Sequence, residues 1–378
     1  MKRTSLKWKV TTLAALIGAG TAGQALASPD FDIRGRAHFD AGFYDEDETQ
    51  LDDNVILRRA RIGVNGTLDE NWDGRIEYDF SEEDVSAADV RLRRSLPMGR
   101  LIIGQTKVPM GLNQLTSSNN ITFIERSSVS NVIPDARRIG LGYEMSDGPL
   151  TFQSRLYTRA LGDDKEEGNA QFGGAIRTVF NPIHQGNEML HLGFSVAYED
   201  LGDQREVRFA DRPESRPAGK RLIDTDEIDA ITDADSTLKY GLELAYQNGP
   251  FSAEAEYLSV DMDRRDNSDP TFSGYHVQGS YVLTGESRSY GGGSFGGITP
   301  SSPSGAWEVA ARFSQMDLED SGVMGGEQQS ITLGLNHYVT PNLRFMANLI
   351  RTDVDNGPRA NGQDETFNTA LFRAAYHF

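Results

Sequence analysis

Arginine recurs at alternate positions in the first third of the chain, where it could bind anions. Its planar guanidinium stays charged and can hold an oxyanion through two parallel hydrogen bonds. Because alternate side chains of a strand share one face, these arginines would form a single cationic wall, with neighbouring strands about 4.8 Å apart. The wall consists of Arg34, Arg36, Arg59, Arg61, Arg75, Arg91 and Arg93.

These arginines could instead serve only to neutralise acidic side chains of the same face. Asp40, Asp73, Glu77 and Asp79 share their parity and offer such partners. Both arrangements are usual inside β-barrels, so the pattern leaves anion binding and purely structural pairing open.

No grouping of residues indicates catalysis. The sequence has no cysteine, no nucleophile elbow, no zinc-type histidine pair and no phosphate-binding glycine loop, and its six histidines are scattered. We therefore expect no enzyme, no catalytic residue, no metal site and no cofactor.

The arginines belong to segments of about ten residues in which apolar and polar side chains alternate. In the first segment Phe31, Ile33 and Phe39 share one parity, and the arginines share the other. This pattern predicts a transmembrane barrel with lipid outside and water inside, since a one-residue shift would cost about 2–4 kcal/mol for each basic residue placed in hydrocarbon. We expect an all-β, sixteen-stranded antiparallel barrel with strands near 31–44, 54–67, 72–81, 86–96, 100–107, 138–146, 150–160, 171–182, 188–200, 237–247, 251–262, 273–284, 305–316, 328–338, 343–353 and 367–378. Arg312 lies on the inward parity of its strand.

The chain ends indicate export to the outer membrane. Basic residues precede an apolar run and the triplet Ala25-Leu26-Ala27, which is the pattern of a cleaved signal peptide. We expect a signal peptide at 1–27 and an outer-membrane β-barrel domain at 28–378. The last strand places Phe372, Tyr376 and Phe378 on one parity, which resembles the signal that the barrel-assembly machinery reads. We therefore expect Phe378 to contact that machinery.

Charge and hydropathy exclude several classes of protein. The net charge of −19 makes nucleic acid an unsuitable partner. Hydrophobic residues make up only 38%, without a helix-length apolar run beyond the signal, which excludes a helical membrane protein. The expected surroundings are outer-membrane lipid and lipopolysaccharide.

Short turns alternate with longer connections, as in bacterial barrels with both ends in the periplasm. The longer connections, many of them acidic, should lie on the outer side at 45–53, 108–137, 201–236, 263–272, 317–327 and 354–366. The connection 285–304 falls on the periplasmic side, yet it is long and rich in glycine and serine, so we expect it to fold into the lumen.

The connection 108–137 is the strongest candidate for narrowing the pore. It combines hydroxyl and amide side chains with Arg126, and it ends in Arg137 and Arg138. As a plain surface loop it would expose Phe123, Ile124 and other apolar residues, so packing against the inner wall is favoured.

Several blocks of sequence resemble the phosphate-selective porin O/P family, in the family's order and across nearly the whole expected mature chain. The first residues of the six blocks are Arg58-Arg59-Ala60-Arg61-Ile62-Gly63-Val64, Trp72-Asp73, Gly104-Gln105-Thr106-Lys107-Val108-Pro109, Thr122-Phe123-Ile124-Glu125-Arg126-Ser127, Leu283-Thr284-Gly285-Glu286 and Gly305-Ala306-Trp307-Glu308. The resemblance implies a sixteen-stranded homotrimer with inward-folded loops and an arginine ladder that leads anions to a central site. It also implies that Lys107 and Arg126 are pore contacts.

The sequence thus predicts an outer-membrane porin for passive diffusion of small anions, phosphate or other oxyanions in particular. Residues 28–378 contain only four lysines, which favours one alternative, a general or cation-leaning porin. The acidic outer loops favour another, a non-conducting barrel with a structural or adhesive role.

Overall fold

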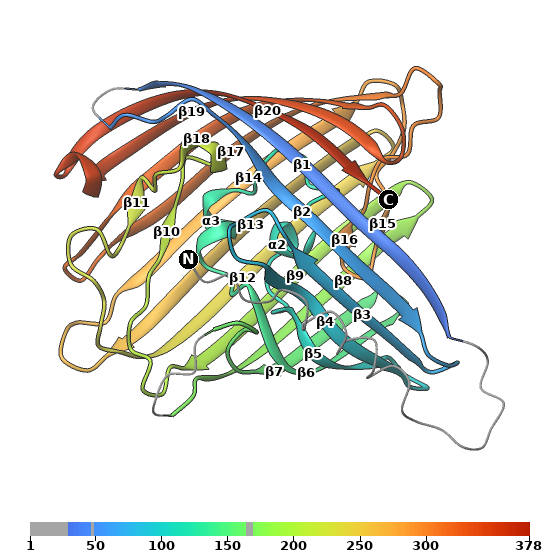
Figure 1. The fold of residues 1–378 in the computed structure, drawn as a ribbon, viewed down its shortest axis with the longest axis horizontal. Coiled ribbons are helices and arrows are strands. Elements are labelled where there is room, and N and C mark those ends of the chain that lie inside the picture. Colours follow the sequence, from blue (N-terminus) through green and yellow to red (C-terminus); the bar gives the residue numbers. More distant parts are fainter. Residues whose placement is uncertain (1–28, 47–48, 164–168) are drawn as a thin grey trace, which may run out of the picture.

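Sixteen antiparallel strands close into a barrel, as predicted (Figure 1). The computed structural model describes residues 29–46, 49–163 and 169–378, so the expected signal peptide at 1–27 lies outside the described residues. β1 (Asp30–Glu46) pairs with both β2 (Asn54–Thr67) and β20 (Gln363–His377), which leaves the sheet without a free edge. The other barrel strands are β3 (Trp72–Asp79), β4 (Ser86–Ser95), β5 (Arg100–Lys107), β6 (Arg137–Asp147), β7 (Leu150–Tyr157), β8 (Phe172–Gln185), β9 (Glu188–Asp200), β12 (Ala234–Asn248), β13 (Phe251–Arg264), β14 (Thr271–Val282), β17 (Ala306–Asp320), β18 (Val323–Tyr338) and β19 (Leu343–Gly357).

Side chains of the strands divide between the two faces of the wall according to the predicted parity. On β1, Ile33 is 69% exposed and Phe39 54%, whereas His38 and Asp40 are buried inside the barrel. An outer face this apolar suits contact with lipid, and the inner face is polar. Among the described residues, no helix is long and apolar enough to cross a membrane.

A β-bulge interrupts the alternation on β2. His38 lies opposite Arg59 and Phe39 lies opposite Leu57, so Arg58 is the extra, unpaired residue. The outward residues accordingly change from odd numbers before the bulge (Val55) to even numbers after it (Ile62).

The prediction of a long connection at 317–327 is wrong. β17 and β18 continue through it to a tight turn at Ser321-Gly322. The apolar alternation fades here while the backbone pairing continues, with Glu319 opposite Met324. Likewise, β19 and β20 shorten the connection predicted at 354–366 to five residues around the short η2 helix (Pro358–Ala360).

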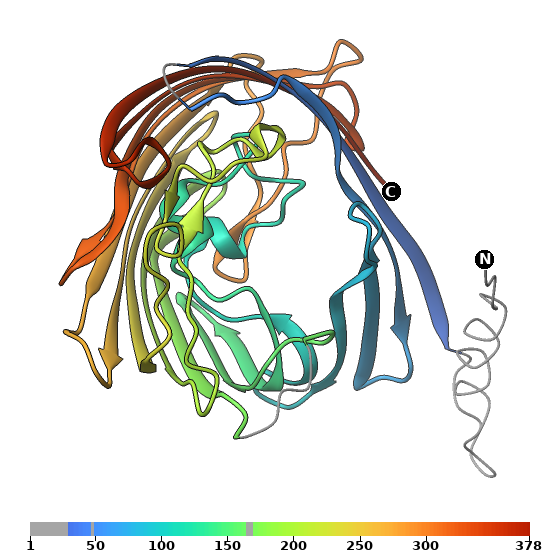
Figure 2. The same ribbon diagram turned by 60° about the vertical axis from the view of Figure 1, so that its left-hand side comes forward.

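Three connections fold into the lumen (Figure 2). The first, 108–136, contains α2 (Leu112–Leu115) and α3 (Ser128–Val132). The second, 201–233, contains β10 (Ala210–Asp211), η1 (Arg216–Ala218) and β11 (Ile223–Asp224); the third, 283–305, contains β15 (Tyr290–Gly291) and β16 (Ser294–Phe295). Inward folding was predicted for the first and third, whereas the second was expected to be a solvated outer loop.

The inward loops are held by an apolar core inside the barrel. Val108, Met110 and Val129 of the first loop pack in one buried cluster with Phe209 of the second loop and Met316 of the wall. Figure 2 shows the loops inside the barrel, with much of their length beside the later strands. The first loop also reaches the arginine-bearing strands, since Arg36 of β1 donates to Ser118 at 3.0 Å and Arg58 of β2 donates to Glu125 at 2.7 Å.

Candidate anion pore

The predicted arginine wall forms on β1 to β4, with several of its charges directly opposite one another. Arg36 is the register partner of Arg61, and Arg75 is the partner of Arg91. Like charges in such pairs are destabilising. This arrangement is therefore difficult to explain by stability alone.

Acidic side chains neutralise part of this wall. Ion pairs join Arg61 to Asp79 at 2.7 Å, Arg93 to Asp73 at 2.9 Å, Arg137 to Asp89 at 2.7 Å and Arg36 to Glu77 at 3.5 Å. The wall arginines thus pair with acidic side chains, as the structural alternative predicted. Whether the wall can also attract anions depends on the net charge that these pairs leave.

A cavity of about 480 Å³ lies between the wall and loop 108–136, and its charge balance is strongly positive. Its acidic lining residues are Glu77, Asp89 and Glu144. Its ten basic lining residues are Arg36, Arg58, Arg59, Arg61, Arg75, Arg91, Arg93, Lys107, Arg126 and Arg137. Within the described parts of the chain, cations outnumber carboxylates in this lining by more than three to one.

Nine of the twelve basic residues singled out in the sequence line this cavity, and three lie elsewhere. Arg34 is on β1 beyond the cavity lining. Arg138 points to Asp135 and Glu199 at 3.4 and 3.8 Å. Arg312 is buried under the loops, where it bonds Glu214 and donates to the carbonyl of Glu125 at 3.0 Å.

Arg58 is the cavity residue that strand periodicity misses. Strict alternation would turn Arg59 into the lumen and its neighbour Arg58 toward lipid. Because of the bulge, both side chains point into the lumen. The only hint in the sequence is the cost of a lipid-facing arginine, which is unfavourable by about 2–4 kcal/mol at mid-depth.

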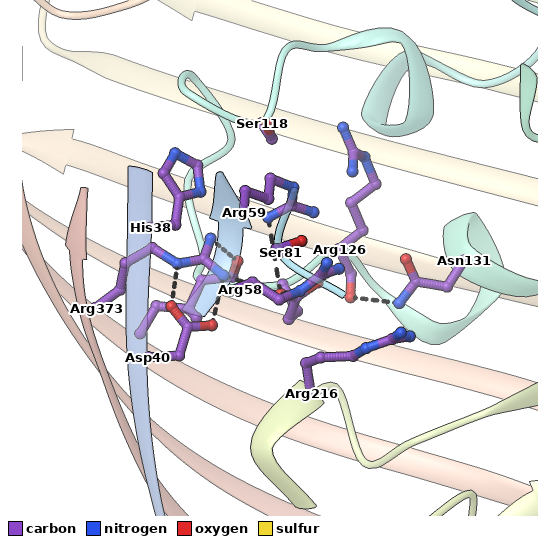
Figure 3. A network of polar contacts seen from close by, with 12 residues as sticks. His38, Asp40, Arg58, Arg59, Ser81, Ser118, Arg126, Asn131, Arg216 and Arg373 are labelled. Atoms are coloured by element: carbon purple, nitrogen blue, oxygen red, sulfur yellow. Dashed lines mark hydrogen bonds and ion pairs between the residues drawn. The ribbon is translucent and has the colours of Figure 1, made fainter. Parts of the chain in front are cut away.

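Glu125, in the inward loop 108–136, is surrounded by arginines from the barrel wall. It accepts hydrogen bonds from Arg58 at 2.7 and 3.1 Å and from Arg373 at 2.9 Å, and Arg59 lies 3.9 Å away. Figure 3 shows Arg373 facing Asp40, with Arg58 and Arg59 beside Arg126. Burial favours a neutral carboxyl, yet these arginines hold the pKa of Glu125 well below its ordinary value. Its charge therefore ties the loop to β2 and β20.

Lys107 and Arg126 both brace the loop as well as lining the cavity. Lys107 Nζ donates to the carbonyl of Gln114, and Arg126 donates to the carbonyls of Asn113 at 2.8 Å and Thr116 at 2.7 Å. Burial lowers the pKa of Arg126 to about 10, an effect that Glu125 partly offsets. Arg126 therefore remains charged at neutral pH.

Comparison with known proteins places the chain in one family. The family described as phosphate-selective porin O and P matches residues 31–378. Porin O of Pseudomonas aeruginosa is 28% identical over 366 residues, which cover 86% of this chain and 82% of that protein.

Two solved structures are alike in fold. OmpT of Vibrio cholerae in its trimer form has a TM-score of 0.58 at 13% identity, covering 93% of this chain and all of that one. An anion-selective porin from Comamonas acidovorans has a TM-score of 0.54 at 13% identity, covering 92% of this chain and all of that one. The match over residues 31–378 shows that the chain belongs to the phosphate-selective porin O and P family.

Proposed function

We propose that this outer-membrane porin conducts small anions, including oxyanions such as phosphate, down their own gradient and without a covalent step. The observation that carries the proposal is the cavity with ten basic and three acidic lining side chains. Such an excess of fixed positive charge raises the local concentration of anions and lowers that of cations.

The interspersed carboxylates suit passage rather than tight binding. An oxyanion must exchange water for arginine contacts that are strong enough to admit it and weak enough to release it. Asp79 and Asp73 occupy part of the donor capacity of Arg61 and Arg93, which limits how firmly those residues can hold a solute. The anion would therefore move between partly engaged guanidinium groups.

We also propose how the protein is exported, inserted and assembled. The protein would lose residues 1–27 on export, insert among lipid and lipopolysaccharide with the help of the barrel-assembly machinery at Phe378, and form a homotrimer. The trimeric form of the OmpT structure supports the last step. At the C-terminus, Phe378 exchanges two backbone hydrogen bonds of 3.1 Å with Gly35, and its ring is exposed on the barrel.

The reversal potential in planar bilayers under a KCl gradient tests the selectivity. We expect the sign that corresponds to chloride preference, together with a reduced chloride current when phosphate is added. A preference for potassium would overturn the anion proposal.

The second candidate is an anion porin without preference for phosphate. It is favoured by the hydrogen bonds of Lys107, the one lysine in the described cavity lining, to carbonyls of loop 108–136. In that case phosphate would leave the chloride current unchanged.

A further inference from the structure

Two carboxylates and an imidazole meet inside the later strands, away from the arginine cavity. Glu254 and Glu256 lie on one face of β13, and His276 of β14 is the register partner of Glu256. His276 Nε2 is 3.1 Å from Glu254 Oε1 and 3.7 Å from Glu256 Oε2, and all three residues are buried.

This cluster lacks the guanidinium partner that other buried acids of the lumen have. Glu243 has Arg177 at 2.6 Å, and Glu308 has Arg288 at 2.6 Å. Among the described residues, no lysine or arginine forms an ion pair with Glu254 or Glu256. Two buried carboxylates beside one imidazole leave a negative charge that needs a counter-ion.

The imidazole is oriented as in a metal ligand. His276 Nδ1 lies 3.0 Å from the hydroxyl of Ser127 in loop 108–136. If Nδ1 donates its hydrogen to that hydroxyl, the lone pair of Nε2 points toward the two carboxylates. An outer hydrogen bond of this kind typically fixes the ring of a metal-binding histidine.

Asn113 supplies an independent sign of a missing partner. The residue is 3% exposed, and its Nδ2 donates to Glu254 Oε1 at 2.9 Å, while its Oδ1 is buried without a hydrogen bond. Turning the amide group over would exchange its two polar atoms, so that Oδ1 replaces Nδ2 beside Glu254. Oδ1 would then face Glu254 Oε1, an arrangement that a cation between the two oxygens would stabilise.

We propose that Glu254, Glu256 and His276 bind a divalent cation of the zinc type, with Asn113 Oδ1 as a fourth ligand. Zinc accepts nitrogen and oxygen ligands at about 2.0–2.2 Å, which puts tetrahedral ligand atoms about 3.4 Å apart. The observed separations of 3.1 and 3.7 Å bracket that value. No metal site was expected from the sequence, because strand register and an inward loop bring these ligands together from distant segments.

The site would join the wall to the loop that narrows the lumen. Glu256 accepts the backbone N–H groups of Leu112 and Asn113, and Ser127 belongs to the same loop. A bound cation would therefore fix loop 108–136 to β13 and β14, a different part of the wall from its contacts with Arg58 and Arg373.

Zinc binding can be measured on the full chain in detergent. Chelator-treated protein is titrated with ZnCl₂ by calorimetry, and a second sample is refolded with equimolar zinc and its metal content determined. We expect one zinc per chain in both. Ser127→Ala should weaken affinity about 10- to 100-fold, as loss of an outer hydrogen bond does, and His276→Gln should abolish stoichiometric retention.

His191→Gln is the matched control. His191 is also buried in the lumen beside a carboxylate, Glu243 at 3.0 Å, but Arg177 already pairs with that acid, so zinc binding should be unchanged. Channel conductance reports folding of each variant. Absence of bound zinc in both wild-type samples overturns the proposal. Zinc affinity equal to wild type in Ser127→Ala also overturns it. The Ser127→Ala measurement decides the question even if His276→Gln does not fold.

Discussion

Arg288 Nη1 donates a hydrogen bond of 2.7 Å to the carbonyl of Asn120, which joins two loops that enter the barrel from opposite ends. The same guanidinium donates to Glu308 on the wall at 2.6 Å. Loops 108–136 and 283–305 therefore restrain each other as well as being held by the wall. We expect this junction to help hold both loops in place inside the barrel.

Replacing Arg288 should loosen the junction. Arg288→Met leaves Glu308 with weaker partners in a buried site, and breaking such a pair costs about 3–5 kcal/mol. We expect a lower denaturation midpoint in detergent and noisier single-channel current. The exposed pair of Arg351 and Asp353 provides the control, since Arg351→Met should change stability by at most about 1 kcal/mol. Equal effects of the two variants would contradict the structural role of Arg288.

Selectivity should depend on which face of β4 loses a charge. Arg93 lines the cavity, whereas Arg94 lies on the outer face with its guanidinium 5.5 Å from the centre of the Trp72 ring. Arg93→Gln should shift the reversal potential toward zero, more at 0.1 M than at 1 M KCl because salt screens fixed charge. Arg94→Gln should leave it unchanged. A similar shift in both variants would mean that the cavity does not set selectivity.

Removing the charge of Glu125 should affect selectivity and stability in opposite directions. Glu125→Gln keeps the shape but leaves Arg58 without a carboxylate partner, whereas Arg373 keeps Asp40 at 2.6 Å. The lumen beside the arginine cavity becomes more positive, so anion preference should increase while the denaturation midpoint falls. Glu82→Gln, in an exposed pair with Arg216, should change neither. A weaker anion preference in Glu125→Gln would contradict the placement of the anion path beside these arginines.

Asp211 should make the docking of loop 201–233 sensitive to pH. Burial raises the pKa of Asp211 to about 7 from 3.8, and its Oδ2 accepts a hydrogen bond of 3.2 Å from Asn131. The docked carboxyl therefore binds its proton more tightly than the free one. Docking is most stable below pH 4, weakens as pH rises toward 7, and loses about 4 kcal/mol across that interval.

Stability of wild type and Asp211→Asn, measured in detergent between pH 4 and pH 8, tests this expectation. The variant should lose the decline seen in wild type. Asp229→Asn changes an exposed position of the same loop and should keep the wild-type profile. Parallel profiles for wild type and Asp211→Asn would exclude a buried, protonated Asp211.

The amino-acid sequence was sufficient to determine the barrel, its sixteen strands and most of the arginine wall. The reason is that parity is local: each strand must turn one set of side chains to lipid and the other to water, and a shifted register is penalised at every charge. Phe39 and Asp40 can be assigned to opposite faces without knowledge of any neighbouring strand.

Only the tertiary structure could place Arg58, Arg312 and the inward loop 201–233. Arg58 turns inward because β1 and β2 pair with a bulge, and a bulge depends on two strands rather than one. Arg312 has the predicted parity but is covered by Glu214, which a loop brings from about a hundred residues away. Such contacts depend on how loops fill a closed lumen, and no periodicity along one segment records that.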